Sequence, residues 1–165
     1  MILSTTASAP GVGAASYSPT SDEVVFIHGP LVSETAELGF YKTTNRRGGV
    51  VLADGSGDIR FLDMRDVTSA ATTPGAHRGG THRHEYTLDG KRIGFTCDDF
   101  LTTTYGRNIG MMVPHDRAPG GVSHWSVLLV PVVPSATAKP GELVKADSDS
   151  WIGSKGLMRG FIGQV

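Results

Sequence analysis

Two histidines separated by one residue, His82 and His84, are the side chains whose type and spacing best suit chemistry in this sequence. Residues at positions i and i+2 of a β-strand point to the same face, so a strand here would present both imidazoles together. Two neutral imidazoles supply half of a Zn²⁺ or Mn²⁺ shell, which a third histidine or a carboxylate would complete. The pair is therefore a candidate ligand set for a divalent metal.

Charged residues around this pair support other interpretations. His77, Arg78 and Arg83 could instead make an anion pocket, because guanidinium groups bind carboxylates and phosphates through paired hydrogen bonds. The histidines and Glu85 could also simply satisfy one another and the nearby backbone in a polar channel. If this segment binds a ligand, we expect the site to be made from its polar residues, namely Arg78, His82, Arg83, His84 and Glu85.

A few residues outside this segment could also have a chemical role. Asp98 and Asp99 could hold a metal or act as a base, although such acids more often cap a turn. His124 with Trp125 could form a sugar-stacking platform, or the tryptophan could belong to the core. Cys97 has no CxxC partner and is not expected to be a nucleophile. The sequence also lacks a Gly-x-Ser-x-Gly elbow and a P-loop.

The segment that carries the histidines belongs to an internal repeat. Tyr17–Phe26 recurs in altered form as Tyr86–Phe95, 69 residues later, and a fainter third copy begins near Trp151. Repeated units of this kind bury their apolar faces only against one another. His82 and His84 correspond to Gly13 and Ala15 in the first copy, so these are the positions where function would have to lie.

Short runs rich in β-branched and aromatic residues, bounded by Gly, Pro, Asp and Asn, predict an all-β fold. The predicted strands are Glu23–His28, Gly48–Leu52, Asp58–Asp63, Lys91–Thr96, Asn108–Val113 and Trp125–Val130, with inner strands ending at Tyr17 and Tyr86. A single helical turn is conceivable over Thr35–Tyr41. About four strands per repeat is the pattern of β-propeller blades.

Composition excludes several classes of protein. A formal net charge of −1, with no basic patch, argues against a nucleic-acid partner. The single cysteine excludes an internal disulfide. Met1–Gly13 has no basic start or apolar run of the signal-peptide type, and the longest apolar stretch, Val127–Val133, is too short to span a bilayer. These features favour a soluble protein, with the cytoplasm the favoured compartment and no membrane partner.

The two best copies of the repeat, YSPTSDEVVF and YTLDGKRIGF, resemble the aromatic–Ser–Pro–Asp–Gly–Lys segment of TolB-like propellers, with Leu88 in place of the proline. Other segments more closely resemble a family of uncharacterised TolB-like proteins, a domain of unknown function: Pro10–Tyr17, Thr44–Gly48, Gly79–Glu85 and Tyr105–Pro114. The resemblance implies a propeller whose first strands line a central channel. It implies little about function, because propellers host many.

The His-x-His sequence is also similar to the metal-binding strand of oligogalacturonate lyases, which are TolB-like propellers. In that family, histidines and a glutamine hold a divalent metal that acidifies the proton removed in β-elimination of a uronate. Only His82 and His84 carry over, because the spacing to the next aromatic is one residue shorter and Gln164, the sole glutamine, does not match. Asp98 or His115 would be further ligand candidates.

The repeats suggest one TolB-like segment over residues 1–165. We expect blade one at about 10–70, blade two at about 77–133, a linker at about 134–147 and the start of blade three at about 148–165. Because closed propellers usually have four to eight blades, we expect a fragment of a longer propeller. Open blade edges would then favour self-association or a protein partner.

These observations favour a binding or scaffold protein with a polar channel site. The expected ligand is a small anionic or saccharide molecule, or a peptide partner. The alternative is a metal-dependent, lyase-like enzyme acting on a polysaccharide, and the sequence leaves open which of the two applies.

Overall fold

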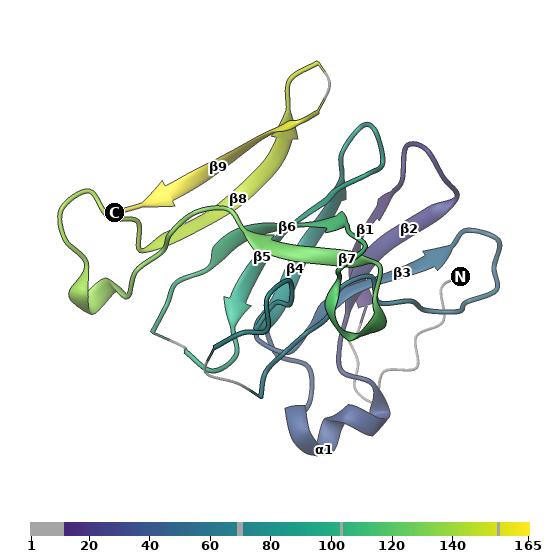
Figure 1. Cartoon of the computed structure of the whole chain (residues 1–165), viewed down its shortest axis with the longest axis horizontal. Helices are drawn as coiled ribbons and strands as arrows, with labels where there is room; N and C mark the ends of the chain where they lie inside the picture. Colours follow the sequence, from purple (N-terminus) through teal and green to yellow (C-terminus); the bar gives the residue numbers. More distant parts are fainter. Residues whose placement is uncertain (1–11, 69–70, 103, 155) are drawn as a thin grey trace.

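The computed structural model describes residues 12–68, 71–102, 104–154 and 156–165. Two parts of the sequence-based interpretation lie outside these residues: the start of the chain, where no signal peptide is expected, and the two ends of the expected first blade, at 10–11 and 69–70. The described part is all-β, as predicted, and consists of antiparallel sheets (Figure 1).

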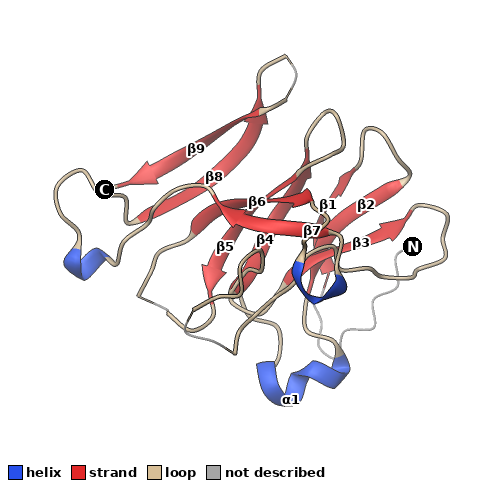
Figure 2. Cartoon of the chain, viewed as in Figure 1, coloured by secondary structure: helices blue, strands red, loops and turns tan. Residues whose placement is uncertain are grey.

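Within the described residues, strands pair only with strands next to them in the sequence, and they form three sheets in chain order (Figure 2). Sheet one contains β1 (Val12–Tyr17), β2 (Glu23–His28) and β3 (Arg47–Leu52). Sheet two contains β4 (Gly79–Tyr86), β5 (Ile93–Asp99), β6 (Asn108–Pro114) and β7 (His124–Leu128). Sheet three contains β8 (Lys145–Ile152) and β9 (Met158–Gln164).

Helical structure in the described residues is confined to short turns between strands. The helical turn considered over Thr35–Tyr41 is present as α1 (Thr35–Leu38). Turns of 3₁₀ helix occupy Val32–Glu34, Pro119–Gly121 and Ser135–Thr137. None of the helices found in this part of the chain combines the length and apolar character needed to cross a membrane.

One predicted strand is wrong. Asp58–Asp63 forms only isolated bridges: Arg60 pairs with Val50 of sheet one, and Asp63 then pairs with His124 of sheet two. The segment crosses from one sheet to the next, so it cannot remain in a single ladder. At the end of this segment the consecutive residues Leu62 and Asp63 are both buried, whereas a half-buried strand buries alternate residues.

The first strand of every sheet contains a β-bulge at the same place. The register shifts between Gly13 and Ser16 in β1, between His82 and Glu85 in β4, and between Asp147 and Ser150 in β8. The second residue of each bulge has a positive φ: +48° at Ala14, +52° at Arg83 and +52° at Ser148. The repeat seen in the sequence is thus also a repeat of backbone conformation, with Trp151 following the third bulge as Tyr17 and Tyr86 follow the first two.

The main core lies between sheets one and two. Val25 and Val50 come from sheet one and Ile93, Phe95 and Met112 from sheet two, and all are almost fully buried. Leu62 from the crossing segment, Tyr86 and Cys97 complete this cluster. Burial of apolar surface in this cluster stabilises the fold by about 25 cal/mol per Å². It also fixes the positions of β4 and β5, which carry most of the candidate site.

Candidate functional site

The bulge in β4 changes the expected relation between the two histidines. Arg83, between them, has a left-handed backbone and an exposed side chain, and the pairing of β4 with β5 shifts by one residue across it. Because a bulge breaks the alternation of side chains, the expectation that His82 and His84 share one strand face through regular i, i+2 spacing is wrong. The two imidazoles lie in different surroundings.

His84 is enclosed between sheets one and two, with only 2% of its surface exposed. Its Nε2 lies 2.9 Å from Oγ1 of Thr81, and its ring is tilted against Phe95 at a centroid distance of 6.3 Å. Gly48 of β3 leaves the space that the imidazole occupies. Burial lowers the pKa of His84 to about 3, so the ring is neutral at pH 7.

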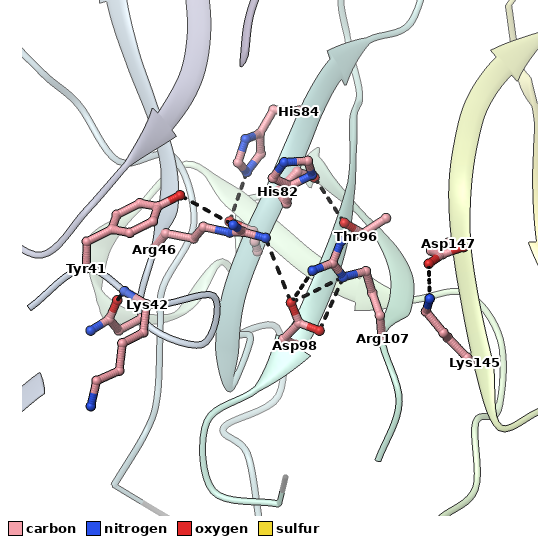
Figure 3. A network of polar contacts seen from close by, with 12 residues as sticks. Tyr41, Lys42, Arg46, His82, His84, Thr96, Asp98, Arg107, Lys145 and Asp147 are labelled. Atoms are coloured by element: carbon pink, nitrogen blue, oxygen red, sulfur yellow. Dashed lines mark hydrogen bonds and ion pairs between the residues drawn. The ribbon is translucent and has the colours of Figure 1, made fainter. Parts of the chain in front are cut away.

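His82 is only partly buried and lies beside two arginines and a carboxylate (Figure 3). Nη2 and Nε of Arg107 donate to the carboxylate of Asp98 at 2.7 and 3.2 Å, and Nη2 of Arg46 lies 3.8 Å from the same group. Figure 3 shows the two guanidinium groups reaching this carboxylate from two sides. We call Arg46, His82, Asp98 and Arg107 the Asp98 cluster.

The electrostatics of the Asp98 cluster are dominated by its arginines. Burial lowers the pKa of His82, and the positive charges of Arg46 and Arg107 lower it further, so His82 is neutral at pH 7. The side chain of Arg46 is 7% exposed and donates through Nη1 to the Tyr41 hydroxyl at 3.3 Å. Its Nε has no hydrogen-bond partner among the described residues. The cluster thus has a formal charge of +1, from two arginines and one aspartate.

The remaining expected site residues lie elsewhere. Arg78 donates from Nε and Nη2 to Asp99 at 2.9 and 2.8 Å and lines a separate cavity. Glu85 accepts hydrogen bonds from Ser150 and from the backbone N–H of Trp151, and its own carbonyl accepts from the Trp151 indole at 2.8 Å. Glu85 therefore ties sheet two to sheet three. Arg83 points to solvent.

No group of three or more His, Cys, Asp or Glu side chains in the described residues is arranged to hold a metal ion. Asp98, whose charge acts on His82, is bound by arginines, and Asp99 is paired with Arg78. Metal binding by His82 and His84 stays a prediction.

Sequence reasoning missed the two arginines of the Asp98 cluster. Arg107 directly precedes β6 and stands across the β5–β6 hairpin from Asp98, next to the pair Cys97 and Asn108. That contact could have been inferred from the hairpin register, since residues opposite each other on antiparallel strands interact. Arg46 directly precedes β3 of another sheet, and no local pattern links it to Asp98.

The fold and this site define an all-β protein of face-packed antiparallel sheets with a charged cluster at the first strand of sheet two. Residues 11–124 match the family described as "Protein of unknown function (DUF3748)", and the chain belongs to that family. This confirms the expected membership of a family of unknown function. The matched range begins just before β1, ends at the first residue of β7 and contains the whole Asp98 cluster.

A curated relative is the "Uncharacterized protein YidR" of Escherichia coli strain K12. It is 34% identical over 168 residues, a match that covers 93% of this chain and 38% of the relative. The chain therefore spans well under half of the length of that relative. No solved structure is significantly similar to this chain.

Proposed function

We propose that this chain is a binding module that recognises a small anion, such as the carboxylate of an acidic sugar, at the Asp98 cluster. The observation that carries the proposal is that two guanidinium groups share one carboxylate, which leaves one positive charge uncompensated. Charge-assisted hydrogen bonds to guanidinium are about twice as strong as neutral ones, and the low exposure of Arg46 reduces screening by water.

The surrounding architecture supports the same proposal. We infer that the three sheets are blades of a TolB-like propeller, with β1, β4 and β8 as the first strand of each blade. The shared bulge and the order of the strands support this inference. In such a propeller the first strands line a central channel, and His82 of β4 would bring the Asp98 cluster to that channel. A ligand would then enter along the channel axis.

Binding is favoured over the metal-dependent lyase alternative. A lyase of that type would need a further metal ligand beside His82 and His84. The Asp98 carboxylate is held by Arg46 and Arg107, whose positive charges oppose a cation there. The same charges attract an anion.

Isothermal titration of the 165-residue chain with galacturonate tests the proposal, with galactose as the uncharged control. We expect galacturonate to bind and galactose not to bind. Arg107→Gln should weaken galacturonate binding by about tenfold or more, or about 1.4 kcal/mol. Arg60→Gln is the matched control, because Arg60 is exposed and pairs with Glu23. Equal binding of both sugars, or no difference between the variants, would contradict the proposal.

The same samples address the lyase alternative. We expect galacturonate binding to persist after treatment with EDTA. A metal-dependent appearance of the ultraviolet absorbance of unsaturated uronates, with oligogalacturonate as substrate, would instead support the enzyme.

A further inference from the structure

A cleft of about 400 Å³ lies beside α1, and none of the described residues that line it belongs to the Asp98 cluster. Glu34, Glu37 and Leu38 line it from the helical turns, and Arg47 lines it from the start of β3. The segment 64–68 forms a further part of its wall. The volume of the cleft falls within the range of about 300–1,000 Å³ typical of small-molecule sites.

Two arginines of this cleft have hydrogen-bond donors to spare. The side chains of Arg47 and Arg65 are 12% and 5% exposed, and Nη1 of Arg47 and Nη2 of Arg65 lie 3.8 and 3.7 Å from the same atom, Oε1 of Glu34. These distances exceed the range of about 2.7–3.2 Å for a hydrogen bond. Among the described residues neither nitrogen has a hydrogen-bond acceptor, and both keep accessible surface, whereas Nε of Arg47 is buried. The two accessible nitrogens can therefore donate to a ligand.

The positive charges of these two arginines are close enough to repel each other. Burial, and then repulsion from Arg47, lower the pKa of Arg65 to about 10, although the carboxylates of Glu34, Asp63 and Glu37 oppose the shift. Arg65 is charged at pH 7, but its present partners do not fully offset the cost of burying that charge. A ligand carboxylate that accepted hydrogen bonds from both arginines would satisfy their donors and reduce the repulsion.

Glu37 supplies a carboxylate that forms an ion pair with no described cation, although its charge reaches Arg65. Its side chain is exposed. Glu34 and Glu37 are three residues apart in consecutive helical turns, so their side chains lie on the same side. A cation bound by Glu37 would thus lie next to the arginine pair. The other acidic residue of the cleft, Asp66, already accepts hydrogen bonds on both of its oxygens.

This arrangement of charges favours a ligand that carries both signs. Two arginines and three carboxylates line the cleft and sum to a formal charge of −1, so the acidic side chains would repel a simple anion. Apolar side chains complete the described lining, namely Leu38, Met64, Val67 and Val122. An apolar group of the ligand would be buried against them, beside the charged end of the ligand.

We propose that this cleft binds a free α-amino acid with an apolar side chain. The carboxylate of the amino acid accepts hydrogen bonds from Nη1 of Arg47 and Nη2 of Arg65, and its ammonium group pairs with Glu37. Its side chain packs against Met64 and Val67. The inference does not depend on anion binding at the Asp98 cluster.

Three probes that differ only in their charged groups test this proposal: L-leucine, N-acetyl-L-leucine and L-leucinamide. Isothermal titration of the 165-residue chain at pH 7 should show binding of leucine. N-acetyl-leucine lacks the ammonium charge and leucinamide lacks the carboxylate, so each should bind at least about tenfold more weakly. Equal binding of the three probes, or no binding of leucine up to about 10 mM, would overturn the proposal.

Two variants assign the two charged groups of the ligand to their partners. Glu37→Gln should lower the affinity for leucine to that for N-acetyl-leucine, and an unchanged affinity for leucine would overturn the proposal. Asp22→Asn, at an exposed acid in the turn between β1 and β2, is the matched control. Arg65→Lys keeps the charge but changes the donor geometry, and it should weaken leucine binding by about tenfold.

Far-UV circular dichroism checks the fold of each variant. Because Glu37 is exposed, Glu37→Gln keeps the test decisive even if the buried change Arg65→Lys prevents folding. Galacturonate binding should be unchanged in Glu37→Gln, which keeps the cleft experimentally distinct from the Asp98 cluster.

Discussion

The imidazole of His84 on β4 lies directly against Gly48 on β3, so that a Cβ at residue 48 would stand 2.7 Å from Nε2. Real Cβ atoms do not approach other atoms this closely, and the enclosed ring has little room to move. This contact joins sheets one and two beside the bulge of β4. It makes residue 48 a sensitive point for the stability of the chain.

Gly48→Ala should therefore lower the free energy of unfolding by about 1–3 kcal/mol, the usual cost of adding atoms to a packed core. Urea denaturation followed by tryptophan fluorescence measures the change. Gly13→Ala is the control, since a Cβ at Gly13 meets nothing within 4 Å. An unchanged midpoint for Gly48→Ala would show that His84 can move aside.

Gly94→Ala should loosen sheet three from sheet two. A Cβ at Gly94 would collide with the guanidinium of Arg159, which is paired with Asp149 and stacks 4.6 Å from the Trp151 ring centroid. We expect a loss of about 1–3 kcal/mol and faster amide exchange in β8 and β9 than in β5. Gly160→Ala, where a Cβ makes only ordinary contacts with Ile152, should exchange like the wild type.

The buried neutral His84 should make the chain less stable as the pH falls. Its pKa is lowered to about 3 in the folded state from 6.5, so between these values the unfolded state binds a proton that the folded state does not. Stability is therefore lost as the pH falls below about 6.5, by about 1 kcal/mol per unit.

Urea denaturation at pH 7 and pH 5 measures this slope, and His84→Gln should reduce it. His28, whose pKa burial also lowers, contributes to the slope in both proteins, so the difference between them is the informative quantity. His115→Gln, at an exposed site, should keep the wild-type slope. Identical slopes for the wild type and His84→Gln would contradict the assignment.

Asp98→Asn should strengthen galacturonate binding several-fold, because it removes the negative charge with which the ligand competes for Arg46 and Arg107. Calorimetric titration gives the affinity, and the gain should shrink as the salt concentration rises. The control is Asp116→Asn, since Asp116 is almost fully exposed. Weaker binding in Asp98→Asn would mean that the carboxylate itself contacts the ligand.

The strands could be predicted because their pattern is local. Glu23–His28 is predicted with its observed bounds, since β-branched and aromatic residues run between polar turns. The bulges could not be predicted, because Ala14, Arg83 and Ser148 are not residue types that signal a left-handed backbone. A glycine or asparagine there would have given the signal.

Only those residues of the candidate site that lie on a single strand could be predicted from the sequence. His82 was singled out from its spacing, whereas Arg46 reaches Asp98 only because sheet one packs against sheet two. From the sequence, His77 was considered only as one of several basic residues near His82 and His84. Its partner Asp63 lies in the crossing segment, whose apolar residues at 59 and 61 resemble a strand. Long-range pairing of this kind depends on the packed core and not on neighbouring residues.

The bulges of β1, β4 and β8 share one backbone conformation, but they carry side chains of different chemical character. The three equivalent tripeptides are Gly13–Ala15, His82–Arg83–His84 and Asp147–Ser148–Asp149: one small and uncharged, one basic and one acidic. One backbone conformation accepts all three. The backbone conformation of the bulge therefore does not depend on any one set of side chains.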